Sequence, residues 1–220
     1  MRGLQFHENM IENQLKRHGV RMGEVRYVLH THLHIDHAGK DDLFPMNTTV
    51  VINRRELEYS VSGLMHPQYP LPDTKHLIDR LHTKHALRLL DLEISGITEI
   101  IPGVTVEAAG AHTEGSMNVH VETSEGLATI CGDVIYDFND QIIEPYHRIM
   151  DWEPQVTGNH GMSKRQEIGA IRKLLNGAKF LLPVHDRPAK IEGGQVVGRL
   201  HESVPGPLTQ SVPKRAWFPA

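Results

Sequence analysis

The sequence predicts a mixed α/β fold, and three observations point to it. Short apolar segments with strand patterning alternate with amphipathic helical segments, 220 residues suffice for one large core, and turn-forming Gly and Pro are spread along the chain. We therefore expect a single domain over 1–220. Because 39% of the residues are hydrophobic and 23% are charged, the composition is that of a globular protein rather than a disordered or fibrous one.

The first elements are a helix and two short strands. We expect the helix over 10–18, with Asn9 as its N-cap and Gly19 in the capping position at its C-terminal end. A mostly buried strand follows over 25–30 (VRYVLH), and a second apolar strand covers 49–53 (TVVIN). The first strand leads directly into a cluster of histidines.

A polar helix is expected around 54–59, and a stretch rich in turn-forming residues follows it. The stretch 60–74 contains three Pro, a Gly and two Ser, and it leads into a predicted helix from about 75 to 92. Long connections of this kind inside a compact domain are often functional lids. We interpret 60–93 as a lid insert, not as a separate domain.

The second half predicts a β-meander followed by a helix and further strands. Short strands with turns run through 97–131, and Ser163 begins a helix that extends to about Leu175. The segment 180–184 (FLLPV) is a buried strand that ends at a histidine, and 196–200 (VVGRL) is expected to be an edge strand.

Charge and cysteine content exclude several classes of protein. The net charge is −4 and the pI about 6.5, so neither a nucleic-acid surface nor a membrane surface is indicated. Cys131 is the only cysteine, cannot form an internal disulfide and is expected to be a buried hydrophobe. With no apolar run near the length of about 18 residues that crosses a bilayer, and no signal-peptide core at the N-terminus, we expect a cytoplasmic protein.

Histidine is the unusual residue of this chain. There are 16, more than the 12 Phe, Tyr and Trp together, and four lie between His30 and His37 in the segment HTHLHIDHAG. If that segment is extended, His32, His34 and Asp36 face one way and His37 points elsewhere, a spacing that can divide ligands between two metal ions. An exposed run of histidines without function is the alternative, but it does not explain why the run follows a strand.

Three further candidate ligands stand at the ends of apolar strands: His112, Asp133 and His185. Imidazole and carboxylate donors without thiolate suit zinc, iron or manganese in an open catalytic site. The remaining histidines of the predicted lid are interpreted as solvated residues rather than a third metal site; they are His66, His76, His82 and His85.

These residues resemble the signature of the metallo-β-lactamase superfamily, T-H-x-H-x-D-H followed by a later His, Asp and His. Thr31, His32, His34, Asp36 and His37 match the signature, and His112, Asp133 and His185 match the later ligands. The resemblance covers about residues 8 to 190 and implies an αββα sandwich with its metals at one edge between the sheets. It further implies two divalent ions, zinc being favoured and iron or manganese the alternatives.

The resemblance also implies how the ligands are shared. His32, His34 and His112 would bind one metal, Asp36, His37 and His185 would bind the other, and Asp133 would bridge them. Two adjacent cations lower the pKa of a shared water and supply hydroxide near pH 7, while one of them polarises the carbonyl under attack. Asp36 is placed to carry a proton to the leaving group.

Tyr136 narrows the resemblance to the N-acyl homoserine lactonase-like branch. That branch carries Asp-x-x-Tyr, which matches Asp133 and Tyr136, and its phenol donates a hydrogen bond to the substrate carbonyl. An ordinary packed loop tyrosine is the alternative. The resemblance predicts a hydrolase that opens a lactone or cleaves a carboxylic ester, and its partners would be a small ester or lactone, with no nucleic acid and no membrane.

Other functions keep the same ligands and stay open. A glyoxalase II-like thioester hydrolase is the nearest alternative, and a phosphodiesterase or a catalytically idle metal-binding interaction protein would also fit. Members of the family usually begin with two or three strands, and by this resemblance roughly 40 to 60 residues are lacking ahead of the first helix. Three explanations fit: a gene start placed too late, a truncated natural form, or a homo-oligomer in which a neighbour covers the exposed sheet edge.

Overall fold

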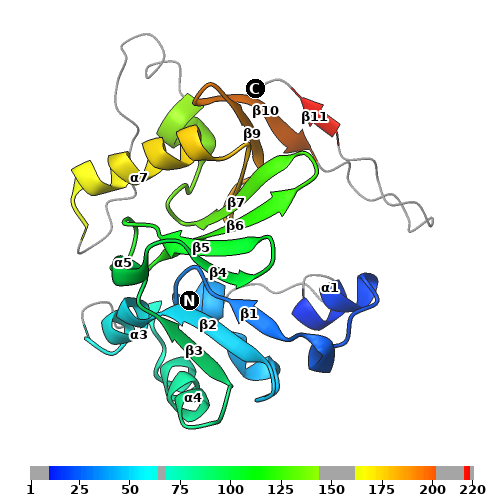
Figure 1. Ribbon diagram of the computed structural model, residues 1–220, viewed down its shortest axis with the longest axis vertical. Helices are drawn as coiled ribbons and strands as arrows, with labels where there is room; N and C mark the ends of the chain where they lie inside the picture. Colours follow the sequence, from blue (N-terminus) through cyan, green and yellow to red (C-terminus); the bar gives the residue numbers. More distant parts are fainter. Residues whose placement is uncertain (1–9, 64–67, 144–161, 202–215, 219–220) are drawn as a thin grey trace. The chain divides into compact units, whose positions relative to one another are not determined.

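The computed structural model describes residues 10–63, 68–143, 162–201 and 216–218 (Figure 1). The chain folds into two compact units, Met1–Leu90 and Asp91–Ala220. The single-domain organisation over 1–220 stays a prediction. Within the described residues, no helix has the length and apolar character needed to span a membrane.

The first unit is built on a parallel sheet in the order β1-β2-β3. The strands are β1 (Tyr27–Leu29), β2 (Thr49–Asn53) and β3 (Leu87–Leu90). Its helices, with their bounds, are α1 (Ile11–Arg17), η2 (Met22–Glu24), α2 (Ile35–Ala38), η3 (Asp41–Leu43), α3 (Arg54–Ser60) and α4 (Leu71–Leu81). Because β2 is the central strand, its apolar run TVVIN is buried almost throughout, as the unbroken pattern predicts for a parallel sheet.

The core of the first unit lies around β2. Val50 and Ile52 are fully buried there and pack with Leu33, Leu57 and Leu77, which come from the loop after β1, from α3 and from α4. The loop after β1 is the histidine segment, so its backbone is tied into this core. Gly19 adopts φ 72° directly after the C-cap of α1, which confirms it as the left-handed residue that ends this helix.

The predicted helix over 75–92 is wrong in its second half. Helix α4 ends at Leu81, a turn follows, and residues 87–90 form strand β3, which pairs in parallel with β2. The short run Leu-Arg-Leu-Leu fits either a helix or a strand, and pairing with β2 decides it. Residues 71–90 therefore contribute a helix and a strand to the first unit, and the interpretation of 60–93 as a lid stays a prediction.

The second unit is built on an eight-stranded sheet in the order β11-β10-β9-β8-β7-β6-β5-β4. Its elements are α5 (Leu92–Ser95), β4 (Thr98–Ile101), β5 (Val104–Ala108), β6 (Met117–Thr123), β7 (Gly126–Gly132), η5 (Asn139–Ile143), α7 (Lys164–Gly177), β8 (Phe180–Pro183), β9 (Ala189–Glu192), β10 (Gln195–His201) and β11 (Ala216–Phe218). The predicted meander is confirmed as β4 to β7. The segment 196–200 is not an edge strand, because β10 pairs with both β9 and β11.

Helix α7 packs on this sheet through an apolar face. Ile171 and Leu174 are buried with Leu181 of β8 and Ile191 of β9. The predicted start at Ser163 is confirmed, since the Ser163 Oγ accepts the backbone N–H of residue 166 at 3.3 Å in a capping box. The helix leads directly into β8, which pairs in parallel with β7, and this pairing brings the carboxyl ends of two strands together.

A cluster of charged side chains links the two inner strands of the meander, β5 and β6, to helix α7. Glu107 of β5 lies 3.4 Å from the His120 Nε2 of β6 and 2.6 Å from the Lys173 Nζ of α7. The hydrogen bond from His120, followed by that from Lys173, lowers the pKa of the Glu107 carboxyl to about 2. A carboxylate with a lowered pKa stabilises the folded state above its ordinary pKa, and this stabilisation is lost as the pH falls from about 4.5 through 2.

We expect Glu107→Gln to lower the free energy of unfolding by about 1 to 2 kcal/mol at pH 7 and by clearly less at pH 3. Urea unfolding at the two pH values measures this difference. Glu122→Gln is the matched control, because Glu122 is an exposed glutamate on neighbouring β6. An equal loss at pH 7 and pH 3 for Glu107→Gln would show that its charge does not carry the stabilisation.

Candidate metal centre

The first unit gathers four candidate donors after strand β1. His32 and His34 are buried, with ring centroids 4.6 Å apart, and each offers a ring nitrogen within 4.8 Å of the other. His34 is also the N-cap residue of α2, so the helix begins at the next residue, Ile35. Thr31 Oγ1 lies 3.2 Å from His32 Nδ1, a contact that holds the orientation of this ring.

The expected alternation of directions fails from Ile35 onward, because the donor atom of Asp36 groups with that of His37 and not with those of His32 and His34. An extended loop would turn His37 away from His32, but the two ring centroids lie only 3.9 Å apart. The cause is α2: from Ile35 onward the backbone is helical, and one helical turn brings His37 back toward the extended part of the loop. Asp36, on the same short helix, is exposed, and its Oδ2 lies 3.7 Å from the His37 Nε2.

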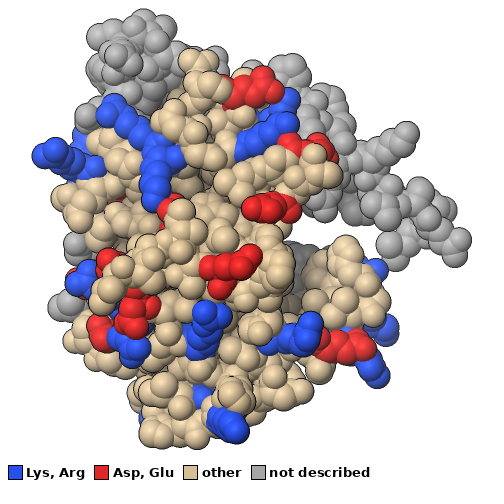
Figure 2. Space-filling model, in the orientation of Figure 1, with Lys and Arg blue, Asp and Glu red and all other residues tan. Residues whose placement is uncertain are grey.

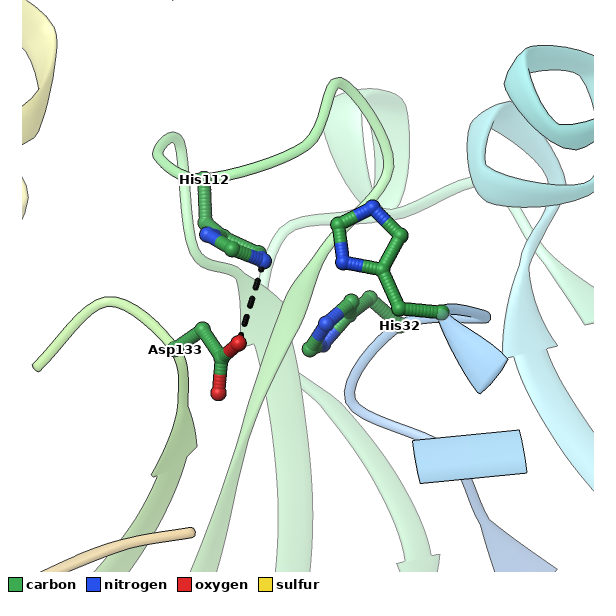
Figure 3. Close-up of side chains that lie close together, drawn as sticks. His32, His112 and Asp133 are labelled. Carbon is green, nitrogen blue, oxygen red and sulfur yellow. Dashed lines mark ion pairs between the residues drawn. The ribbon is translucent and has the colours of Figure 1, made fainter. Parts of the chain in front are cut away.

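In the second unit, two candidate imidazole donors lie beside one candidate carboxylate donor. Asp133 directly follows β7 and His185 follows β8, so the parallel pairing of these strands places both residues at the same sheet edge. The Asp133 Oδ2 lies 3.3 Å from the His112 Nε2, and its Oδ1 lies 3.4 Å from the His185 Nε2. Figure 3 shows the His112 ring directed at the carboxylate of Asp133. Each oxygen of a single buried carboxylate thus faces a different imidazole.

His112 reaches this position through an unusual backbone conformation. Its φ is 70°, in the left-handed region of backbone conformation that residues other than glycine rarely adopt. The loop is closed by internal hydrogen bonds: Ser116 Oγ donates to the carbonyl oxygens of Ala111 and Thr113, and the Ala109 N–H donates to the Ser116 carbonyl at 2.8 Å. A conformation of this kind costs about 1 kcal/mol, and such residues cluster at functional sites.

Tyr136 lies beside one of these histidines. Its ring stacks on that of His185, with centroids 4.1 Å apart and an interplanar angle of 16°, and the residue is 42% exposed. Gln141 holds the loop, since its Oε1 accepts the backbone N–H groups of Tyr136 and Asp137. The Asp186 carboxylate accepts the Phe138 N–H at 2.8 Å and joins this loop to the one that carries His185.

The histidines outside the candidate site differ from one another. His82 and His85 are exposed, as predicted. His76 is half-buried and lies 3.3 Å from the Asp41 carboxylate, so its interpretation as a solvated residue is wrong. His66 lies outside the described residues.

The chemistry of the donor set fits divalent metal ions. All seven candidate donors are imidazoles or carboxylates, which suit zinc and related metals. Cys131 is buried as predicted, and burial raises the pKa of its thiol to about 12. Among the described residues, Cys131 belongs to neither group of candidate donors.

Sequence reasoning did not single out Glu56 as a residue of this region. Glu56 lies on α3 and is 1% exposed, and its Oε1 accepts the backbone N–H of Leu33, which stands between His32 and His34. No local sequence pattern marks Glu56, because its approach to the loop depends on the parallel pairing of β1 with β2. Residues that follow neighbouring parallel strands meet at one sheet edge.

A mixed α/β fold whose strand ends carry clustered histidine and aspartate donors defines a metal-binding α/β protein. A family model described as the metallo-beta-lactamase superfamily matches residues 2–175. The chain belongs to this superfamily, and the resemblance drawn from its sequence is confirmed.

Curated relatives that match the sequence of this chain include N-acyl homoserine lactonases. An N-acyl homoserine lactonase of Bacillus thuringiensis is 28% identical over 139 residues, 61% of this chain and 50% of the relative. A second, from Bacillus cereus, is 30% identical over 140 residues, again 61% and 50% of the two chains. The chain thus spans about half the length of the curated relatives it matches.

Solved structures share the fold at lower identity. A probable metal-dependent hydrolase from Staphylococcus aureus aligns with a TM-score of 0.67 at 17% identity, over 90% of this chain and 69% of its own. The dizinc quorum-quenching lactonase AidC, in complex with a product, aligns with a TM-score of 0.58 at 17% identity, over 96% and 70% of the two chains. The predicted metallo-β-lactamase fold class is confirmed.

Proposed function

We propose that the protein is a dinuclear metal-dependent hydrolase that opens a lactone of the N-acyl homoserine lactone kind or cleaves a related carboxylic ester. The observation that carries the proposal is Asp133, whose two carboxylate oxygens face two different imidazoles, at 3.3 and 3.4 Å. A carboxylate shared in this way is suited to bridge two ions. The lactonase relatives supply the substrate class, which belongs to those proteins and is proposed here for this chain.

The proposed ligand set is the one that the family signature implies. His32, His34 and His112 would hold one ion, Asp36, His37 and His185 the other, and Asp133 would bridge them. We propose zinc, with iron or manganese as alternatives, because the donors are nitrogen and oxygen. When bound, such ions would lower the pKa of water and polarise the substrate carbonyl.

The chain's own residues would supply the remaining steps. Asp36 is exposed, so its carboxylate can exchange protons with substrate and solvent, and we propose that it carries a proton to the leaving oxygen. Tyr136 is fixed against His185, and its phenol can donate a hydrogen bond to the carbonyl oxygen as negative charge develops there. Both roles need a residue that is accessible to substrate.

Tyr136→Phe is expected to lower kcat for lactone opening by about ten- to a thousandfold, because it removes one donor to the developing oxyanion. The ring that stacks on His185 is retained, so the metal content should not change. Steady-state kinetics together with elemental analysis measures both quantities. Unchanged kcat would remove Tyr136 from the proposed chemistry and weaken the assignment to lactones.

The net charge of the chain and the face shown in Figure 2 do not indicate a polyanionic substrate. Basic and acidic side chains both occur on the face shown in Figure 2, with wide uncharged areas between them, and the net charge of the chain is −4. Phosphodiester hydrolysis on nucleic acid would instead benefit from a basic surface. Thioesters and phosphodiesters are still tested, because the alternative hydrolases of this fold would act on them.

The proposal is tested by metal content and by a substrate panel. Protein purified without chelators is analysed by elemental mass spectrometry and then assayed against N-acyl homoserine lactones, simple esters, thioesters and a phosphodiester. The proposal expects two ions per chain and fastest turnover of a lactone or ester. Fastest turnover of a thioester would favour the thioester hydrolase, and two ions without turnover would favour a metal-binding interaction protein.

A further inference from the structure

We propose that Glu56 is a positioning residue for the metal-binding loop and that Tyr69 completes this role. The Glu56 Oε1 accepts the backbone N–H of Leu33 at 2.9 Å and the hydroxyl of Tyr69, also at 2.9 Å. Leu33 is the residue between His32 and His34, so the Glu56 carboxylate accepts a hydrogen bond from the backbone between these two histidines. This inference rests on the proposed function, because it takes these two histidines as metal ligands.

A carboxylate in this place is costly unless it has a role. Glu56 is 1% exposed, and removing an ionised carboxylate from water costs several kcal/mol before its partners compensate. Accepting hydrogen bonds from Leu33 and Tyr69 offsets part of that cost, since hydrogen bonds to charged groups are about twice as strong as neutral ones. A metal ion bound by His32 and His34 would place positive charge near the Glu56 carboxylate and would also offset this cost.

The topology of the first unit explains why Glu56 can reach the loop. Strands β1 and β2 are parallel neighbours, with Leu29 opposite Val51. The histidine loop follows β1, and α3, which begins at Arg54, follows β2 directly. Glu56 therefore stands in the first turn of α3, at the sheet edge where the loop passes.

Tyr69 links a second segment to the same loop. Its ring lies 5.0 Å from the ring of His34 and 5.9 Å from that of Tyr59, in a T-shaped contact with the latter. The hydroxyl hydrogen bond fixes the tyrosine, and the ring contact then limits the rotation of the His34 imidazole. Because Tyr69 immediately precedes Pro70, the N-cap of α4, the start of this helix is tied to the orientation of a proposed ligand.

Glu56 acts through the Leu33 peptide and Tyr69, so its effect should be on metal binding before any effect on chemistry. Partners of metal ligands typically contribute about 10- to 100-fold to metal affinity. We expect Glu56→Ala to weaken zinc affinity by about that factor, and Glu56→Gln, which keeps an acceptor oxygen, to weaken it by less. Tyr69→Phe, which removes one donor and keeps the ring, should lower affinity by about three- to tenfold.

Glu58→Gln is the matched control. Glu58 lies on the same helix as Glu56 but is exposed, so this variant loses the same charge without touching the loop. Zinc affinity is measured by competition with a chromophoric chelator, and the absorption spectrum of the cobalt-substituted protein reports the ligand geometry. The proposal expects altered affinity and an altered cobalt spectrum for the Glu56 variants, and wild-type values for Glu58→Gln.

Wild-type affinity and an unchanged cobalt spectrum in folded Glu56→Gln and Glu56→Ala would overturn the proposal. If neither variant folds, Tyr69→Phe decides, and wild-type affinity in that variant would overturn it. The test separates this inference from the proposed function. A wild-type protein that binds zinc but hydrolyses no lactone or ester contradicts the function alone, whereas one that binds no zinc contradicts both.

Discussion

Asp133→Ala should abolish hydrolysis and reduce the bound metal from about two ions per chain to one or none. Asp133 is 3% exposed and lies within 3.4 Å of both His112 and His185, so its carboxylate stands between these two rings. Removing the carboxylate removes the proposed bridge and one negative charge that offsets the charge of two cations. We expect kcat/KM to fall by more than about a thousandfold.

The metal measurement makes this prediction specific. Elemental mass spectrometry of Asp133→Ala, with a far-UV spectrum to check folding, is compared with Asp140→Ala. Asp140 lies seven residues further along the same connection and is exposed, so its removal takes away a charge without touching the donors. A folded Asp133→Ala protein that keeps two ions would show that Asp133 does not bridge them, whatever happens to activity.

The ligand residues could be predicted because their physical signal is local. A polar donor close after an apolar strand is visible in one sequence: Asp133 and His185 follow β7 and β8, and His112 lies four residues beyond the end of β5. The parallel pairing of β7 with β8, which brings Asp133 beside His185, could not be derived in this way. It depends on α7 returning the chain along the sheet, and only the resemblance to a known family implied the result.

Secondary structure was least predictable where a short segment fits two patterns. Residues 87–90 fit the end of a helix, yet they form β3, because β2 offers an edge with four partners in register. Asp36 shows the same limit on a smaller scale. Alternation along an extended chain groups it with His32 and His34, but its donor atom groups with that of His37, since α2 begins at the preceding residue.

The burial of two charged residues, Glu56 and Arg80, could not be predicted from the sequence. Glu56 and Arg80 lie among polar residues of α3 and α4, where the pattern indicates solvent-facing positions. Both are buried because each meets polar groups of another segment. Such partners come from residues far apart in the chain, so no local pattern reports them.

Arg80→Leu should have the largest effect on stability. Arg80 is 0% exposed, its Nε donates to the Asp41 Oδ2 at 2.6 Å, and its Nη2 donates to the Phe44 carbonyl at 2.6 Å. Burial alone would raise the pKa of Asp41, but the hydrogen bond from His30 and the charge of Arg80 outweigh it and hold that pKa below its ordinary value. Asp41 is therefore a buried anion that depends on these partners.

Removing one member of such a group leaves an uncompensated buried charge, which costs about 3 to 5 kcal/mol. Urea unfolding of Arg80→Leu should show this loss, while Arg55→Leu, at an exposed position on α3, should stay within about 0.5 kcal/mol of wild type. Asp41→Asn combined with Arg80→Leu should be less destabilised than the sum of the two single variants, because no unpaired charge then remains. Strict additivity would mean that Arg80 stabilises α4 by packing rather than by pairing with Asp41.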